Sequence, residues 1–301
     1  MRKRLHIKVS RLCNNNCIFC LDDRARRTDI GEREVKAHLE EGKALGGMLF
    51  TCGEPTLHPK LPLFIGMARA AGYRSIGLVT NGRRLSYPDY CDRLLELGLT
   101  EVTLSIHGHA AAMHDALTRT RGSFDQTMAG LRNMSRRKEK QGARLITSTV
   151  ITARNMKRIN ETLKALAAYN VDTMVLNVVE PSGEALRHFD RVTPPYADMA
   201  QCINNAVAGF PGKSKITVEG IPLCFCAGFL ENCGVREEIL LKEGTAFKAL
   251  PTDRNHVKID ACKSCRLTRL CPGIFRKYAK RRGTAEIENA AREAFETPGV
   301  R

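Results

Sequence analysis

Three cysteines lie close together near the start of the chain. Cys13, Cys17 and Cys20 follow a C-x3-C-x2-C spacing within the stretch RLCNNNCIFCL. Thiolates are soft ligands that select zinc or an iron–sulfur cluster over hard cations. A closed [4Fe–4S] cluster takes four cysteines, so a local set of three leaves one iron open to a substrate or cofactor. The alternative is a zinc site completed by a distant residue such as His6.

A second group of cysteines lies far along the chain. Six of the twelve cysteines fall between residues 224 and 271. Cys262, Cys265 and Cys271 form a C-x2-C-x5-C run, which three further cysteines precede. Four thiolates are enough to close a [4Fe–4S] cluster. C-x2-C pairs also bind zinc, so a zinc knuckle is the alternative for this group.

Composition limits the class of protein. The 301 residues, 43% of them hydrophobic, fit one large domain or one domain with a small appendage. We find no long apolar stretch and no signal peptide, so we expect a cytoplasmic protein without membrane contact, whose thiols stay reduced. The formal charge of +16 suggests an anionic partner, such as nucleic acid, a phosphorylated metabolite or an acidic peptide.

The elements that must position these cysteines alternate in type. Six β-like runs, separated by helical patterns, are expected to start near Leu5, Gly47, Ser75, Glu101, Arg144 and Thr173. Such alternation predicts parallel βαβ units with right-handed crossovers. A sheet of this kind carries its chemistry at the carboxyl ends of the strands. We place this α/β domain at residues 1–210 and a cysteine-rich extension at residues 211–301.

Polar residues follow three of these runs. The second run ends in TCGEPTLHP, which contains the turn Cys52–Pro55, and the third ends in LVTNG, which contains Asn81. In the fourth run, VTLSIHG, Thr103, Ser105 and His107 share one face because strand side chains alternate. We expect this polar face to point into the lumen and the apolar face to pack on helices.

The cysteine triplet, with Phe19 before its last cysteine, and the turn Cys52-Gly53-Glu54-Pro55 resemble the signatures of the radical S-adenosylmethionine (radical SAM) superfamily. The turn departs from the family motif at its first position, which is Gly in the family. The resemblance implies a partial (β/α)6 TIM-like barrel and a [4Fe–4S] cluster whose open iron binds S-adenosylmethionine. An electron from a donor such as flavodoxin or ferredoxin would then cleave this cofactor to a 5′-deoxyadenosyl radical.

The resemblance also implies roles for residues at the strand ends. Glu54 is expected to accept a hydrogen bond from the methionine ammonium, and Ser105 to bind the ribose or carboxylate. Thr149 is assigned without knowing which face of the fifth strand points inward. We expect cofactor contacts from Phe19, Cys52, Gly53, Glu54, Pro55, Asn81, Ser105, Thr149 and Asn177.

The loop after the fourth run, HGHAAAMHDALTRTRGSF, resembles a family pattern as well. His107 is a candidate catalytic residue that either touches substrate or only braces this loop. His114 and Asp115 are expected to structure the loop. Ser123 and Gln126 fit a capping box that opens the next helix.

The C-terminal cysteines resemble the auxiliary-cluster extensions called SPASM and twitch, which share the C-x2-C-x5-C run. Phe275 stands where a full SPASM domain has a further cysteine, so we expect one auxiliary [4Fe–4S] cluster. The predicted ligands are Cys224, Cys262, Cys265 and Cys271. Cys224 is favoured as the fourth ligand because Pro222 stiffens the chain before it. Cys226 should point away, and Cys233 is held in reserve.

The sequence therefore predicts a radical SAM enzyme that acts on a small anionic substrate. Modification of RNA or of a ribosomal peptide is the alternative within this class, although the twelve residues before Cys13 leave no room for a leader-binding module. The basic run Arg24–Arg27 beside the cluster loop is a candidate substrate contact. A non-catalytic, metal-dependent nucleic-acid-binding protein is the alternative outside it. That reading leaves the Cys52–Pro55 turn unexplained, and the chain has no Trp for base stacking.

Overall fold

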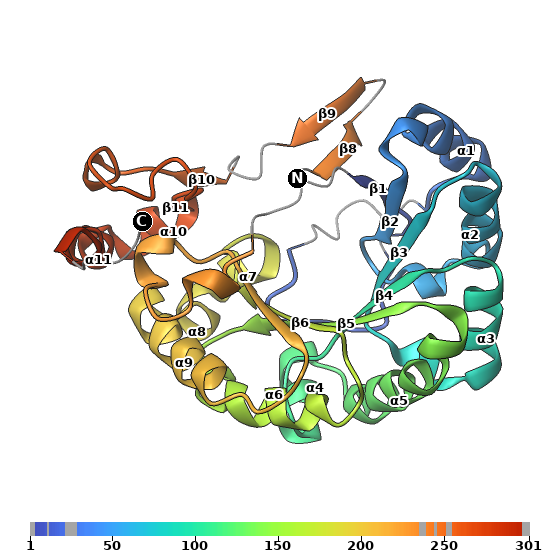
Figure 1. Ribbon diagram of the computed structural model, residues 1–301, viewed down its shortest axis with the longest axis horizontal. Helices are drawn as coiled ribbons and strands as arrows, with labels where there is room; N and C mark the ends of the chain where they lie inside the picture. The colour runs from blue at the N-terminus through green and yellow to red at the C-terminus, as the bar shows by residue number, and fades with distance from the viewer. Residues whose placement is uncertain are drawn as a thin grey trace.

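The computed structural model describes residues 4–10, 12–21, 29–234, 239–243, 246–250 and 255–296. The six predicted strands are present: β1 (Arg4–Lys8), β2 (Gly47–Thr51), β3 (Ser75–Thr80), β4 (Glu101–Ser105), β5 (Arg144–Ile151) and β6 (Thr173–Val178). Each pairs in parallel with the next along the chain. They form an open arc in Figure 1. This confirms the predicted α/β fold with a partial TIM-like barrel.

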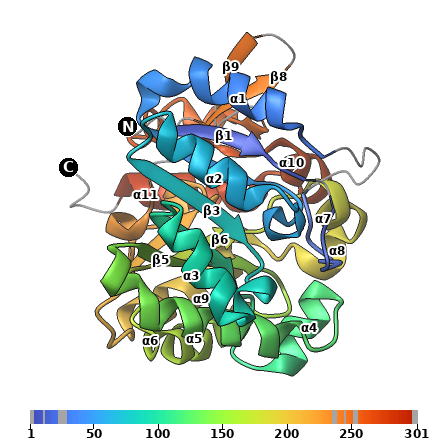
Figure 2. The ribbon, with the colours of Figure 1, turned by 90° about the vertical axis from the view of Figure 1, so that its right-hand side faces the viewer.

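Helices cover the convex side of the arc, as Figures 1 and 2 show. They are α1 (Glu32–Glu41), α2 (Leu61–Ala70), α3 (Pro88–Glu96), α5 (Ser123–Gln141), α6 (Ile159–Ala167) and α9 (Tyr196–Ala208). Three shorter helices belong to the strand-end loops: α4 (Ala111–Thr118), α7 (Gly183–Arg187) and α8 (Phe189–Val192).

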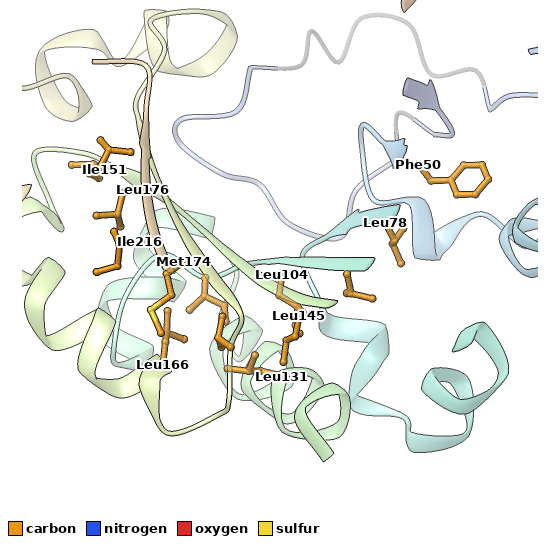
Figure 3. Packing of buried hydrophobic residues seen from close by; sticks show 14 of the residues in the cluster. Phe50, Leu78, Leu104, Leu131, Leu145, Ile151, Leu166, Met174, Leu176 and Ile216 are labelled. Atoms are coloured by element: carbon orange, nitrogen blue, oxygen red, sulfur yellow. The ribbon is translucent and has the colours of Figure 1, made fainter. Parts of the chain in front are cut away.

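The main core lies between the sheet and the outer helices (Figure 3). Leu104, Leu145 and Leu176 point outward from three neighbouring strands, and Leu131 and Leu166 meet them from α5 and α6. All five are at most 1% exposed. Burial of each such side chain contributes roughly 1.5–3 kcal/mol, so this interface fixes which strand faces remain for the lumen.

The sheet continues beyond residue 210, where we placed the domain boundary. Strand β7 (Lys215–Glu219) pairs in parallel with β6, and β8 (Ile239–Glu243) pairs in parallel with β1. Strand β9 (Ala246–Leu250) then pairs antiparallel with β8. The domain boundary at residue 210 stays a prediction. Strands β7, β8 and β9, which follow it in the sequence, nevertheless belong to the same sheet as β1–β6.

The remaining elements form the C-terminal extension: β10 (His256–Val257), β11 (Ile274–Phe275), α10 (Arg276–Arg282) and α11 (Ala285–Glu296). Two buried tyrosines attach it to α9. The Tyr196 N–H donates to Tyr278 Oη at 3.3 Å, and the Phe275 N–H donates to Tyr196 Oη at 3.4 Å. The two rings lie 4.2 Å apart between centroids. The extension is therefore packed on the barrel through a specific polar and aromatic contact.

Candidate cofactor site

The three N-terminal cysteines lie on the loop that follows β1, at the carboxyl edge of the sheet. The Val9 N–H still donates to Thr51 O of β2 at 3.0 Å, after which the loop leaves the ladder. The Cys20 N–H donates to Cys17 O at 3.2 Å, and the Asn15 N–H donates to Cys13 Sγ at 3.4 Å. Local hydrogen bonds within the loop therefore help to fix the backbone around Cys13 and Cys17.

The turn after β2 lies directly against this loop. The Glu54 N–H donates to Leu12 O at 2.7 Å. Gly53 has φ 56°, and a Cβ there would lie 2.6 Å from Leu12 O and closer still to Ser10 O, so only glycine fits. Cys52 has φ 70°, a left-handed conformation that costs an L-residue about 1–2 kcal/mol. The predicted turn and the cysteine loop are therefore in backbone contact.

The Glu54 carboxylate is fully buried and already accepts four hydrogen bonds. The donors are Thr56 N at 3.0 Å, Thr56 Oγ1 at 2.5 Å, Thr80 Oγ1 at 2.6 Å and Asn81 N at 2.6 Å. Burial raises the pKa of Glu54, and these hydrogen bonds oppose the rise. The side chain therefore joins the turn to the end of β3, and its contact with the methionine ammonium stays a prediction.

Asn81 and Arg83, which follow β3, hold the first half of the cysteine loop. Asn81 Nδ2 donates to Asn14 Oδ1 at 2.6 Å and lies 3.8 Å from Cys13 Sγ. The Arg83 guanidinium donates to Asn14 O and, at 3.1 Å, to Asn15 Oδ1. Asn81 was predicted at this site; Arg83 was not, because no local motif marks it.

The second half of the loop lies between the end of α4 and the turn after β6. The Asn16 N–H donates to Thr118 O at 2.8 Å, and Arg119 Nη2 donates to Asn16 Oδ1 at 3.1 Å. On the other side, the Glu184 N–H donates to Cys20 O at 2.9 Å. A Cβ on Gly183 would lie only 2.5 Å from the same carbonyl oxygen. None of the four supporting residues, Thr118, Arg119, Gly183 and Glu184, was predicted to contact the loop.

Phe19 and His107 belong to a buried packing cluster. Their ring centroids are 4.7 Å apart in an edge-on arrangement. His107 Nδ1 accepts from Val150 N at 3.2 Å, and the His107 N–H donates to His114 Nδ1 at 3.2 Å. Burial holds the pKa of His107 well below its usual value and lowers that of His114 to about 4. Of the two roles that we left open for His107, this geometry favours the brace.

Asp115 starts α5 in place of the predicted capping box. Its carboxylate accepts from the N–H groups of Gly122 at 2.7 Å and Phe124 at 2.8 Å, and from Ser123 Oγ at 2.9 Å. Ser123 is the first helical residue and makes no capping bond of its own. Gln126 instead accepts from Arg83 Nε at 2.6 Å. The capping box of Ser123 and Gln126 was therefore wrong.

In β5, Thr149 does not lie on the face that lines the lumen. Thr149 lies on the same side of β5 as the core residues Leu145 and Ile151, and its hydroxyl donates to Ile106 O at 2.6 Å. The opposite face carries Ser148, whose Oγ accepts from Asn177 Nδ2 at 3.0 Å. Ser148 therefore takes the place of Thr149 among the candidate contacts. Ser105 is half-buried and pairs with Ser148 in the ladder.

The four cysteines predicted as auxiliary ligands line one pocket: Cys224, Cys262, Cys265 and Cys271. The N–H groups of Leu223 and Gly273 donate to Cys271 Sγ, each at 3.4 Å. Burial and the three neighbouring thiols raise the pKa of Cys224 to about 12.

Cys226 and Cys233 do not line this pocket. The Cys226 thiol is buried and donates to Pro222 O at 3.6 Å, and the Cys233 thiol donates to Phe229 O at 3.7 Å. Across the described parts of the chain, no three His, Cys, Asp or Glu side chains converge on one point as a single metal ion requires. The predicted basic contact Arg24–Arg27 lies outside the described residues.

The fold and the site define a class of protein: an α/β barrel that presents a three-cysteine loop at the carboxyl ends of its parallel strands. A family model described as "Radical SAM superfamily" matches residues 7–166. The chain belongs to this superfamily and is an enzyme of it. Membership implies a [4Fe–4S] cluster and S-adenosylmethionine as cofactors, together with a source of electrons.

Several curated enzymes are similar to the chain over part of their length. Fe-coproporphyrin III synthase of Methanosarcina barkeri is 34% identical over 45% of this chain and 35% of its own length. GTP 3′,8-cyclase of Chlorobaculum tepidum is 32% identical over 42% of this chain and 39% of its own. The AdoMet-dependent heme synthase of Nitratidesulfovibrio vulgaris is 25% identical over 62% and 50%. The chain thus matches a third to a half of these relatives.

Solved structures share the fold over nearly the whole chain. The enzyme anSMEcpe with bound AdoMet has a TM-score of 0.68 at 16% identity, covering 97% of this chain and 96% of that one. Streptococcus suis SuiB bound to S-adenosylmethionine has a TM-score of 0.66 at 14% identity, covering 93% and 74%. At such low identity the likeness shows the fold alone. No helix in the described part of this chain is long and apolar enough to span a membrane.

Proposed function

We propose that Cys13, Cys17 and Cys20 hold the [4Fe–4S] cluster at which this enzyme cleaves S-adenosylmethionine, before hydrogen abstraction from a small anionic substrate. When bound, the cluster and cofactor supply a 5′-deoxyadenosyl radical. The observation that carries the proposal is the support of the cysteine loop from several strand ends. Asn81, Arg83, Arg119 and the Gly183–Glu184 turn all contact it. Such support gives the preorganised geometry that a reactive site needs.

The chain's own residues would bind and orient the cofactor. Cys52 and Gly53 are half-buried whereas Glu54 is fully buried, so we assign the cofactor contact of the turn to the backbone of these two residues. Asn81, Ser105, Ser148 and Asn177 supply polar side chains at or near the carboxyl ends of four successive strands. In this proposal Glu54, Pro55, Phe19 and His107 act by positioning the loop. A flavodoxin or ferredoxin is the proposed electron donor.

We also infer a single auxiliary [4Fe–4S] cluster at the C-terminal cysteines. Four thiols line one pocket, and the N–H bonds to Cys271 Sγ would stabilise a thiolate there. A zinc knuckle is the alternative for the same four thiols, and iron and sulfide analysis distinguishes the two. Full ligation by protein thiolates suits an electron carrier.

The substrate class rests on charge. The net charge of +16 favours an anion. The names of two curated relatives refer to a coproporphyrin and to GTP, both of which are anionic molecules. We therefore keep a small anionic metabolite as the proposed substrate, ahead of RNA or a ribosomal peptide.

A triple variant tests the assignment of the two sites. After anaerobic purification, changing Cys13, Cys17 and Cys20 to Ala should abolish formation of 5′-deoxyadenosine while leaving about four irons per chain, the content of one [4Fe–4S] cluster. A Cys202→Ala variant, altered at a half-buried thiol of α9, serves as the control and should keep both properties. Loss of all iron from the triple variant would show that the two cysteine groups form one site.

A further inference from the structure

A second pocket lies between the turn after β6 and the C-terminal extension. It encloses about 550 Å³ of empty space, part of it open to solvent, a size within the range of small-molecule sites. It is lined by Glu180, Pro181, Ser182, Asn255, Phe275, Arg276 and Lys277. The first three of these residues lie between β6 and α7, and the last three lie on β11 and at the start of α10, elements labelled in Figure 1. This pocket is separate from the two cysteine sites of the proposed function.

One wall of the pocket leads along the chain to the residues that contact the cysteine loop. Glu180, Pro181 and Ser182 are followed directly by Gly183 and Glu184, which lie against Cys20 O. This wall is therefore connected through the chain to the loop on which the proposed radical chemistry depends.

The opposite wall belongs to the segment that carries the C-terminal cysteines. Phe275 and Arg276 follow Gly273 and Ile274, and these two residues line the four-cysteine pocket. The two walls are tied together, because Asn255 Nδ2 donates to Glu180 Oε1 at 2.7 Å. The two walls of the pocket are thus continuous in sequence with residues that lie beside the two cysteine groups.

The charges in the pocket indicate what it binds. Arg276 and Lys277 contribute two exposed cations, whereas Glu180 contributes one carboxylate that is already engaged with Asn255. Arg276 Nη2 donates to His256 O at 3.2 Å, which holds the guanidinium at the wall. Within the described residues, neither cation forms an ion pair with a carboxylate. Guanidinium and ammonium groups bind carboxylates and phosphates through charge-assisted hydrogen bonds.

We propose that this pocket binds the anionic group of the substrate, a carboxylate or a phosphate, through Arg276 and Lys277. These two residues then determine substrate specificity, and Glu180 positions Asn255 through their hydrogen bond. The inference rests on the proposed function for its reaction, but it concerns binding, which can be measured separately.

Calorimetric titration of the anaerobic holoenzyme at 0.15 M salt tests the pocket with two probes, inorganic pyrophosphate and succinate. We expect one of them to bind at millimolar concentration or tighter, and its identity distinguishes phosphate from carboxylate recognition. The variant R276E/K277E should bind that probe at least tenfold more weakly. Glu180→Gln keeps the acceptor for Asn255 and removes a repelling charge, so it should bind the probe more tightly.

The matched control is K213E/K215E, which makes the same change of charge at two exposed lysines. These lysines lie at the amino end of β7, whereas the pocket lies beyond the carboxyl end of β6. It should leave probe affinity unchanged. Equal weakening in both double variants, or no binding of either probe up to 20 mM, a high ceiling for a specific site, would overturn the pocket assignment. Iron content and 5′-deoxyadenosine formation are measured on the same samples. Their failure with probe binding intact would refute the proposed function and leave the pocket standing.

Discussion

Arg119 and Glu184 form an ion pair at 2.7 Å between Nη2 and Oε2, which joins the residue after α4 to the turn after β6. The second half of the cysteine loop is held between these two elements. The Arg119 guanidinium also reaches Asn16 Oδ1 at 3.1 Å and Cys17 O at 3.5 Å, so one side chain connects both elements with the loop.

Arg119→Ala should therefore weaken the N-terminal site without affecting the C-terminal one. We expect formation of 5′-deoxyadenosine to fall at least tenfold, because misplacement of a reactive site by about 1 Å has effects of this size or larger. Iron release to a chelator should become faster for one cluster only. The control is Arg187→Ala, since Arg187 pairs with the same Glu184 at 2.8 Å but is mostly exposed and forms no hydrogen bond to the described residues of the loop. Equal effects of the two changes would contradict the proposed role of Arg119.

Gly53→Ala tests the contact between the turn and the cysteine loop. The new methyl group would collide with Ser10 O and Leu12 O, so we expect displacement of the loop and loss of most cofactor cleavage. Gly72→Ala is a matched control, because Gly72 also has positive φ, at 90°, but nothing lies within 4 Å of its Cβ position. Gly72→Ala should cost about 1–2 kcal/mol of stability through backbone strain alone and keep activity. Activity assays and chemical denaturation of both variants decide between these outcomes.

His107 and His114 should make the protein less stable in weak acid. A histidine whose folded pKa is lowered is neutral when folded but takes up a proton when unfolded. Stability is therefore full above pH 6.5 and falls as the pH drops toward the folded pKa, which for His114 is about 4. At pH 5.5, His114 alone should lower the free energy of unfolding by on the order of 1 kcal/mol relative to pH 7.5.

Denaturation of the anaerobic protein at the two pH values measures this difference, with iron content determined at each. In His114→Gln the difference between pH 7.5 and pH 5.5 should shrink by a comparable amount. A difference that the substitution leaves unchanged would show that His114 takes up its proton over the same pH range in the folded and the unfolded protein.

Cys224 and Cys226 should behave differently although they are only two residues apart. Cys224 lines the four-cysteine pocket, so Cys224→Ala should lower iron by roughly one cluster per chain and reduce stability, because cluster binding is coupled to folding. Cys226 is buried against Pro222 O outside that pocket, and Cys226→Ala should leave iron unchanged. Iron and sulfide analysis of the two variants provides the measurement. The reverse result would exchange the ligand assignment between them.

The strands could be predicted from sequence because each is a short apolar run between helical patterns, and such periodicity is local. The side chains that support the cysteine loop could not be predicted in this way. Arg83 and Arg119 contact residues 69 and 103 positions away, and nothing near them in the sequence marks such a partner. The inward face of β5 was also ambiguous, since Ser148 and Thr149 are both polar and only packing of Leu145 and Ile151 decides between them.

Competition for polar groups explains two sets of contacts that the motifs did not predict. Glu54 was expected to accept a hydrogen bond from the cofactor, and in the structure hydroxyl and N–H donors from the end of β3 and from its own turn already bind its carboxylate. Ser123 was expected to cap α5, but the Asp115 carboxylate accepts the N–H groups of Gly122 and Phe124, which lie seven and nine positions after it in the sequence. A motif identifies a capable side chain, whereas tertiary structure decides which partner it finds.

The tyrosine contact between α9 and the extension has a consequence for access to the site. Tyr278 Oη accepts from Tyr196 N and donates to the Glu286 carboxylate, while Tyr196 Oη accepts from Phe275 N. Lifting the extension would break the two hydrogen bonds that cross to α9, each worth about 0.5–1.5 kcal/mol, and would expose the buried rings of Tyr196 and Tyr278 to water. Opening the site by displacing the extension therefore carries an energetic cost, so we expect small molecules to enter and leave without moving it.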